Sequence, residues 1–422
     1  MLTRRGFGIM AAATSAAASL PAWAQTALTP EEQFFSEGRY LPLYLDLQTK
    51  AAAGERAAGG LLSQYASFLG DELTALGREE RRRDPAVLLP DLTEAVSRDA
   101  LEAIVDAAAT SRIVILNEAH NTSGHRGFAA RVLRALKPLG FDWFAAETFI
   151  PPQQDPAPSM RGYRRGMPFV SSLGYYVNDP VYAETVREAA RLGYRFADYE
   201  ERWDQEAADD ADSATRIATR ETAEADNLIA AVLASNPDAK VFVYCGYSHA
   251  MEKPHTSGTW FAARLKEKTR LDPLTIEQSM NWPATVAEND PPHVAAVLKR
   301  FAPTAPISVT LNGQMIASPT YKGQMDISVF HPRLPSISGR PGWLMADPER
   351  RAVEVALPPF EGPTLLQAMW SGEGAAGVPA DQFLLEPGQT KATVLLHPGS
   401  YFLRFERADG IDAAFGSIDV KA

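Results

Sequence analysis

The chain has 422 residues, of which 45% are hydrophobic and 22% charged, the balance of a folded globular protein with room for two cores. It carries 52 Asp and Glu against 41 Lys and Arg, and the formal net charge of -11 argues against nucleic acid or an anionic membrane surface as a partner. The single cysteine, Cys245, excludes an intramolecular disulfide, and its apolar neighbours in KVFVYCG predict a buried, unreactive thiol.

The first 24 residues, MLTRRGFGIMAAATSAAASLPAWA, have the order of parts of an export signal. Arg4 and Arg5 are followed by Phe7, by a weakly apolar stretch of small residues and by AWAQ, which predicts cleavage after Ala24. This order resembles a twin-arginine signal and predicts a periplasmic or otherwise exported protein that folds before transport. No later stretch approaches the ~18 consecutive apolar residues of a membrane span.

Residues 26–95 are expected to be helical, and SQYASFLGDELTALG has the spacing of one amphipathic helix. A further helix, SRDALEAIVDAAAT, precedes short apolar runs that alternate with helical periods. The expected strands are RIVIL, FDWFAAE, YRFADYE, KVFVYCG and PLTIEQ, and the helices between them are HRGFAARVLRALKPLG, PVYAETVREAARLG, DSATRIATRETAEADNLIAAVLAS and GTWFAARLKEKT. Strands that are apolar throughout and separated by helices predict a mainly parallel sheet with flanking helices, an α/β domain over residues 25–345.

The chain changes character after another strand candidate, QMDISVFHP, and the loop ISGRPGWLMADP. Residues 346–422 contain short alternating segments separated by PGQ, PGS and ADG turns. In YFLRFER, Tyr401, Leu403 and Phe405 alternate with polar residues, as in a half-buried strand. We therefore predict a small C-terminal antiparallel β-sandwich.

Residues suited to metal or proton chemistry follow four of the five apolar runs. Ligands bind outside the carboxyl ends of parallel strands, so these residues are expected at one edge of the sheet. A single polar residue after a strand is usually only solvated, but the recurrence in a chain with seven histidines indicates a site. In chain order the residues are Glu118, His120, His125, Arg126, Glu147, Asp198, Tyr199, Glu200, His249 and His255.

Two chemistries remain open for this site. Imidazole with carboxylate suits a divalent metal such as zinc, manganese or iron, and a bound metal could activate water. The same pair without a metal can act as a general base and its orienting partner. The long helix adds Glu221 and Glu224 on or beside its buried stripe, with Arg220 adjacent. Because a buried charge is costly unless paired, these residues form either a structural ion pair or a support for a site imidazole.

An ordered set of motifs carries a resemblance to known proteins. IVILNEAHN with a later His, FDWFAAE, RETAEADN, VFVYCGYSHA and GTWFAARL, spread over roughly residues 110–280, are similar to one superfamily. Its members are erythromycin esterase-like hydrolases, ChaN-like haem-binding lipoproteins and the TraB/Tiki membrane metalloproteases. The family usually has Gly where this chain has Asn117, so the tightness of that turn is in question.

The resemblance implies catalytic or metal-binding roles for Glu118, His120, Glu147 and His249, with Arg220 and Glu221 as helix-borne support. The first expectation is an exported hydrolase, metal-dependent or not, that activates water against an ester or peptide.

The second expectation is a haem- or iron-binding protein of the ChaN type without turnover, in which imidazoles such as His125, or Tyr199, ligate the iron. Haem would need an apolar slot, and a lid over a substrate would have the same composition. The candidate residues for either are Phe169, Leu173, Tyr175 and Tyr176. A third reading, a non-catalytic protein that binds through its β-sandwich, has the least support.

Overall fold

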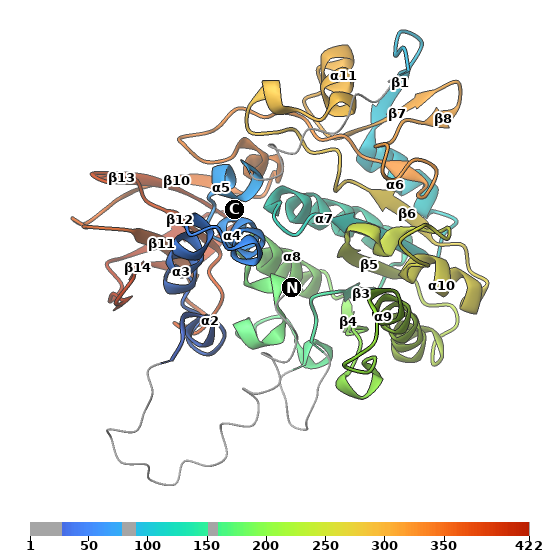
Figure 1. The fold of residues 1–422 in the computed structure, drawn as a ribbon. Coiled ribbons are helices and arrows are strands. Elements are labelled where there is room, and N and C mark those ends of the chain that lie inside the picture. Colours follow the sequence, from blue (N-terminus) through green and yellow to red (C-terminus); the bar gives the residue numbers. More distant parts are fainter. Residues whose placement is uncertain (1–27, 78–89, 151–158, 422) are drawn as a thin grey trace.

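The computed structural model describes residues 28–77, 90–150 and 159–421, so the expected export signal lies outside the described residues. A six-stranded sheet with the order β4-β3-β5-β2-β6-β9 lies at its centre, and its pairings are parallel. This sheet and its flanking helices confirm the predicted α/β class (Figure 1). The strands are β2 (Ile113–Glu118), β3 (Trp143–Ala146), β4 (Arg195–Ala197), β5 (Val241–Gly246), β6 (Leu274–Glu277) and β9 (Ile327–Ser328).

The flanking helices are α6 (Ala100–Ala108), α7 (Ser123–Leu136), α8 (Pro180–Arg191), α9 (Ser213–Leu228) and α10 (Phe261–Thr269). Side chains alternate between the two faces of a strand, so β2 contributes to two separate cores. Val114 and Leu116 pack with residues of α6, α7 and α8, whereas Ile113 and Ile115 pack with residues of α9 and α10. Both faces of the sheet are therefore covered, which explains why its central strands are apolar throughout.

The N-terminal region is helical as predicted, but SQYASFLGDELTALG is two helices rather than one. The helices are α2 (Pro30–Glu37), α3 (Leu41–Ala52), α4 (Arg56–Phe68) and α5 (Glu72–Gly77). The helical path is interrupted at Gly70, between α4 and α5. The φ of Gly70 is +65°, in the left-handed region that glycine adopts at little cost. The core of these helices includes Leu365 of the C-terminal region, beside which they lie in Figure 1.

A small antiparallel sheet was not predicted. It has the order β1-β7-β8, formed by β1 (Val96–Asp99), β7 (Ile307–Leu311) and β8 (Gln314–Met315), and α11 (Pro292–Phe301) precedes β7. The expected helix SRDALEAIVDAAAT therefore begins only at Ala100, after the side chain of Asp99 caps it by accepting a hydrogen bond from the N–H of Glu102.

The C-terminal residues form two antiparallel sheets that share one core. β10 (Arg351–Ala356) pairs with β13 (Lys391–Leu396). The second sheet contains β11 (Thr364–Trp370), β12 (Asp381–Leu384), β14 (Gly399–Arg407), β15 (Gly410–Ile411) and β16 (Gly416–Val420). These sheets agree with the predicted antiparallel C-terminal part.

The expectation of a half-buried strand in YFLRFER is wrong, because both faces of β14 are buried. Tyr401 and Leu403 face the shared core, but Arg404 is only 5% exposed and Glu406 is fully buried. Glu406 accepts a hydrogen bond of 2.8 Å from the N–H of Leu41. The N-terminal helices cover the polar face of this strand.

Cys245 is a free, buried cysteine on β5, and burial raises the pKa of its thiol. Among the described residues, no helix combines the length and the apolar character needed to cross a membrane.

Candidate functional site

The site lies at the carboxyl ends of β2, β3 and β5, which are neighbours in the sheet. Glu118 ends β2 and is paired in register with Gly246 at the end of β5. Glu147 follows β3 and accepts a hydrogen bond from the N–H of Gly246. A Cβ atom at Gly246 would overlap the ring of His120 and lie 2.9 Å from Glu147 Oε2. The absence of a side chain at this position lets the imidazole and the carboxylate approach each other.

Glu118 orients His120. Its Oε1 lies 2.9 Å from Nδ1 of His120, and Arg126 donates to both of its oxygens at 2.9 and 3.0 Å. Burial opposes ionisation of Glu118, but the charge of Arg126 and the hydrogen bond from His120 outweigh it and lower the pKa of Glu118 to about 2. An ionised Glu118 favours the proton on Nδ1 of His120, which leaves Nε2 as the basic nitrogen.

The basic nitrogen of His120 faces Glu147, with Nε2 3.9 Å from Oε1. The imidazole stacks on Tyr176 at a ring distance of 4.1 Å and meets the ring of Tyr247 edge-on at 5.1 Å. Its side chain is 19% exposed, against 7% for that of Glu147. The aromatic rings hold the imidazole in place while part of it remains accessible to a substrate.

His249 forms a second imidazole and carboxylate pair. It lies in η7 (Tyr247–Ala250), directly after β5, and its Nδ1 lies 2.9 Å from Oε2 of Glu221 on α9. Its Nε2 lies 3.6 Å from Oε1 of Glu147. Burial lowers the pKa of His249, but Glu221 and Glu147 outweigh it and raise the pKa to about 9. At neutral pH His249 is therefore a buried cation.

Arg220 is a further cation of the site, beside Arg126 and His249. It donates from Nη2 to Oε1 of Glu147 at 3.0 Å, and its Nε lies 2.7 Å from Oε1 of Glu224, an ion pair whose angle is not that of a hydrogen bond. Burial raises the pKa of Glu224 despite Arg220. Burial also opposes ionisation of Glu147, but His249, His120 and Arg220 outweigh it and lower its pKa. Glu147 is the anion on which three basic side chains converge.

The structure thus brings together the residues Glu118, His120, Glu147, His249, Arg220 and Glu221. Of the alternatives for α9, the geometry agrees with support of an imidazole, since Glu221 contacts His249 directly. Glu224 pairs with Arg220 on the same helix.

His125 and Tyr199 do not point into this group. His125 is fully buried, its Nδ1 accepts a hydrogen bond from the N–H of Ala119, and its ring packs edge-on against Trp282. Burial lowers the pKa of His125 to about 3. The ring of Tyr199 stacks on Phe261 at 5.0 Å. Nε2 of His125 and the hydroxyl of Tyr199 are buried and have no hydrogen-bond partner among the described residues.

The remaining strand-end residues have other contacts. Asp198 accepts a hydrogen bond from Arg161, and His255 lies in an exposed turn, where it bonds to Ser257. Glu200 lies 3.6 Å from Arg220, at the margin of the site. Of the proposed slot or lid residues Phe169, Leu173, Tyr175 and Tyr176, Tyr176 is the one that stacks on His120.

Asn117 stands where the resembling family usually has Gly, and its side chain makes hydrogen bonds to two loops. Its side-chain carbonyl accepts the N–H of Gln278 at 2.8 Å, and its amide donates to the carbonyl of Tyr247 at 2.9 Å. The side chain therefore joins the loops that follow β5 and β6, which a glycine could not do.

Sequence reasoning gave Arg126 no role, and it proposed Tyr176 as part of an apolar slot or lid rather than as a partner of His120. Arg126 is fully buried and also contacts Asp179 at 2.6 Å, so it neutralises two carboxylates. A basic residue in the first turn of the helix after the Glu118 and His120 motif was the available signal. The stacking of Tyr176 on His120 had no local signal.

A metal site is chemically compatible with part of this group. Glu221, Glu224 and His249 each offer a ligand atom within 4.8 Å of the others, and all three are buried. Neither oxygen of Glu224 has a hydrogen-bond partner in the described part of the chain, so the donor set fits a divalent ion. The contact between Arg220 and Glu224 already supplies one positive charge there.

Comparison with known proteins gives no family. No protein-family model matches the chain, and no curated protein does. Among solved structures, a bacterial protein toxin matches at 17% identity and a TM-score of 0.31, over 43% of this chain and 37% of the toxin. The type III effector HopBA1 matches at 13% identity and a TM-score of 0.31, over 46% of this chain and 89% of the effector. RRSP, an effector domain of a MARTX toxin from Vibrio vulnificus, matches at 15% identity and a TM-score of 0.31, over 43% of this chain and 36% of the RRSP chain.

The matched part therefore spans little more than a third of the length of the first of these toxins. Likeness at this TM-score supports no conclusion about activity, and the site has to be interpreted from its own chemistry.

Proposed function

We propose that the protein is an exported hydrolase that activates water against an ester or peptide. One observation carries this proposal: two imidazoles present Nε2 to the same carboxylate oxygen of Glu147, at 3.9 Å for His120 and 3.6 Å for His249, while each Nδ1 is held by another glutamate. An imidazole whose Nδ1 is held by a carboxylate is a typical general base or acid with its orienting partner.

His120 is the proposed general base. Glu118 accepts its Nδ1 proton, so the lone pair of Nε2 is available to take a proton from water. The resulting hydroxide attacks the carbonyl carbon of the substrate. The partial exposure of the His120 side chain gives water and substrate access to this nitrogen.

His249 is the proposed acid. It carries a positive charge at neutral pH, which would stabilise the negative charge that develops on the carbonyl oxygen. Its Nε2 proton can pass to the leaving alcohol or amine, which completes the hydrolysis. Arg220 holds Glu147 between the two rings and adds a second positive charge.

A metal-dependent version of the same function uses Glu221, Glu224 and His249 as ligands. A divalent ion there would lower the pKa of a bound water. This version requires a neutral His249, so the two versions differ in the protonation of one side chain.

The test is turnover of ester and peptide panels by the purified mature protein, with metal analysis and an absorption spectrum. His120→Gln should reduce kcat/KM by ~100-fold or more, since general-base catalysis typically contributes that much. His255→Gln, at an exposed imidazole in the loop that follows β5, is the control, and its kcat/KM should be unchanged. Equal activity of His120→Gln and the wild type would refute the proposal. A strong Soret band without any hydrolysis would favour the haem-binding alternative, which no contact of His125 or Tyr199 supports.

A further inference from the structure

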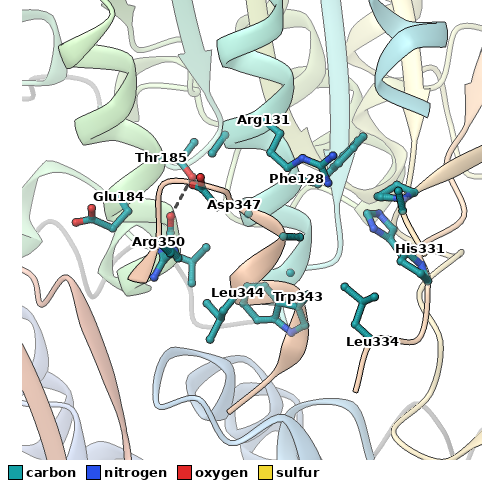
Figure 2. A pocket seen from close by; sticks show the side chains of 18 of the residues that line it. Phe128, Arg131, Glu184, Thr185, His331, Leu334, Trp343, Leu344, Asp347 and Arg350 are labelled. Carbon is teal, nitrogen blue, oxygen red and sulfur yellow. Dashed lines mark hydrogen bonds between the residues drawn. The ribbon is translucent and has the colours of Figure 1, made fainter. Parts of the chain in front are cut away.

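A cavity lies away from the proposed hydrolytic site. It has a volume of about 180 Å3. Residues of α7, α8 and the turn η9 (Gly342–Ala346) line it, among them Phe128, Glu184 and Trp343 (Figure 2). Neither imidazole of the hydrolytic site lines it. The volume is well below the ~300–1,000 Å3 of typical ligand pockets, so any ligand is small.

One face of α7 forms the wall of this cavity. Gly124, Gly127, Phe128 and Arg131 all line it, and their i, i+3, i+4 and i+7 spacing places them on one side of the helix. The neighbouring residue Arg126, which holds Glu118, does not line it. A single helix thus presents one face to the hydrolytic site and another to this cavity.

Gly124 admits an indole ring against the helix backbone, and a second indole lies within ordinary contact distance of Gly127. A Cβ atom at Gly124 would overlap the indole of Trp282, and one at Gly127 would lie 3.5 Å from that of Trp343. The two indoles meet edge-on at a ring distance of 6.3 Å. Together with Phe128 they give the cavity flat aromatic walls.

Arg131 places a cation at this aromatic wall, and the negative charges of Asp99 and Asp347 act on it from a distance. No hydrogen bond or ion pair within 4 Å holds its guanidinium among the described residues, and its Cζ lies 5.8 Å from the ring centre of Phe128. Burial lowers the pKa of Arg131, since the side chain has lost water. A guanidinium in this position can form two parallel hydrogen bonds with one carboxylate.

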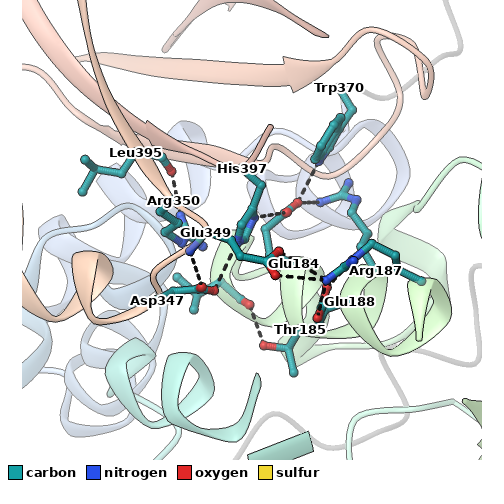
Figure 3. Close-up of polar contacts among 12 residues, drawn as sticks. Glu184, Thr185, Arg187, Glu188, Asp347, Glu349, Arg350, Trp370, Leu395 and His397 are labelled. Carbon is teal, nitrogen blue, oxygen red and sulfur yellow. Dashed lines mark hydrogen bonds and ion pairs between the residues drawn. The ribbon is translucent and has the colours of Figure 1, made fainter. Parts of the chain in front are cut away.

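The carboxylates that line the same cavity are already paired. His397 lies between two of them, with Nδ1 3.0 Å from Glu184 and Nε2 3.1 Å from Asp347 (Figure 3). Glu188 pairs with Arg134 at 2.9 Å. These carboxylates do not need a further cation, and they disfavour a ligand with two negative charges.

We propose that this cavity binds a small organic monocarboxylate with a flat apolar body. The carboxylate contacts the guanidinium of Arg131, and the body packs against Trp282 and Trp343. Arg350 also lines the cavity but donates to the carbonyl of Leu395, so Arg131 is the guanidinium left for a ligand. Aromatic or planar acids the size of benzoate fit this combination of a guanidinium and aromatic walls. The inference does not depend on the proposed hydrolysis.

The test is a titration of the full mature chain with benzoate, followed by calorimetry and by tryptophan fluorescence. Benzoate should bind with one site per chain, whereas benzamide, which has the same shape without the charge, should bind at least ~10-fold more weakly. Inorganic phosphate, which lacks the apolar body, should also bind more weakly. Benzamide or phosphate binding as tightly as benzoate would overturn the proposal.

Variants test whether benzoate binds at Arg131. Arg131→Gln should weaken benzoate binding by ~10-fold or more, and Arg131→Lys, which keeps the charge but loses the planar fork, should weaken it less. Arg195→Gln is the matched control, because Arg195 also lies over an indole, that of Trp143, at 4.4 Å, but outside the cavity. His249→Gln should bind benzoate normally. Unchanged binding in Arg131→Gln, or loss of binding in His249→Gln, would assign the carboxylate to another place and refute the inference.

Discussion

Oε2 of Glu221 lies 2.9 Å from Nδ1 of His249 and also accepts a hydrogen bond of 2.8 Å from the N–H of Phe261. One buried oxygen therefore connects α9, the turn after β5 and the start of α10. Because the backbone N–H of Phe261 fixes the carboxylate, Glu221 in turn fixes the orientation of the imidazole.

The first prediction concerns this carboxylate. Glu221→Gln keeps a hydrogen-bond acceptor but removes the charge, so the pKa of His249 should fall and kcat/KM should drop by ~10- to 100-fold. Steady-state kinetics over a pH series would show the alkaline limb move to lower pH. Glu267→Gln, on the exposed side of α10, is the control. An unchanged pH profile with a large fall in Tm would show that Glu221 serves only the fold.

The second prediction is a loss of stability at alkaline pH. The pKa of His249 is raised from 6.5 to about 9 in the folded chain, so its contribution is fully present below about pH 6.5 and is lost as pH rises through about 9. Urea unfolding midpoints between pH 6 and pH 10 should decrease across this window. In His249→Gln the decrease should be smaller, and an identical decrease would contradict the assignment.

The third prediction concerns Arg126, which contacts Glu118 and Asp179 and is fully buried. Arg126→Leu leaves two buried carboxylates without a cation and should lower the free energy of unfolding by ~3–5 kcal/mol. Arg98→Leu, which breaks an exposed pair with Asp106, should hardly change it. Chemical denaturation of both variants makes the comparison.

The same contacts predict the acid response of the protein. The pKa of Glu118 is lowered from 4.5 to about 2, so its contribution to stability is present above about pH 4.5 and is lost as pH falls through about 2. Thermal unfolding between pH 2 and pH 6 should show this loss. Glu118→Gln should have a flatter profile over that range, and a profile parallel to that of the wild type would contradict the pairing.

The fifth prediction distinguishes metal-free hydrolysis from hydrolysis that depends on a bound divalent metal. Since Arg220 already contacts Glu224 and Glu147, we expect turnover to persist after dialysis against a chelator. Activity that disappears with the metal and returns with zinc or manganese would instead support ligation by His249 and its two glutamates. Measurement of Tm with and without added metal gives a second readout, since a ligand that binds the folded chain raises it.

The main strands and helices of the α/β part followed from the sequence, because hydrophobic periodicity is a local property. The common position of Glu118, His120, Glu147 and His249 also followed, since the carboxyl ends of parallel strands lie at one edge of a sheet. Their chemical roles remain predictions. In the β1-β7-β8 sheet, β1 pairs with β7, which lies some 200 residues later, so that pairing leaves no local pattern. The β7-β8 hairpin did have a local signal, the Asn312-Gly313 turn, which the sequence analysis did not use.

Tertiary structure alone decided which residues reach the site. His125 and Arg126 are adjacent in the first turn of α7, and a step of one residue rotates the side chain by about 100°. As a result His125 packs on Trp282, whereas Arg126 reaches Glu118. The sequence does not show which side of α7 faces the edge of the sheet. The alternation in β14 likewise marked Glu406 as a surface residue. Only the packing of the N-terminal helices buries it, because solvent exposure depends on what the rest of the chain places over a side chain.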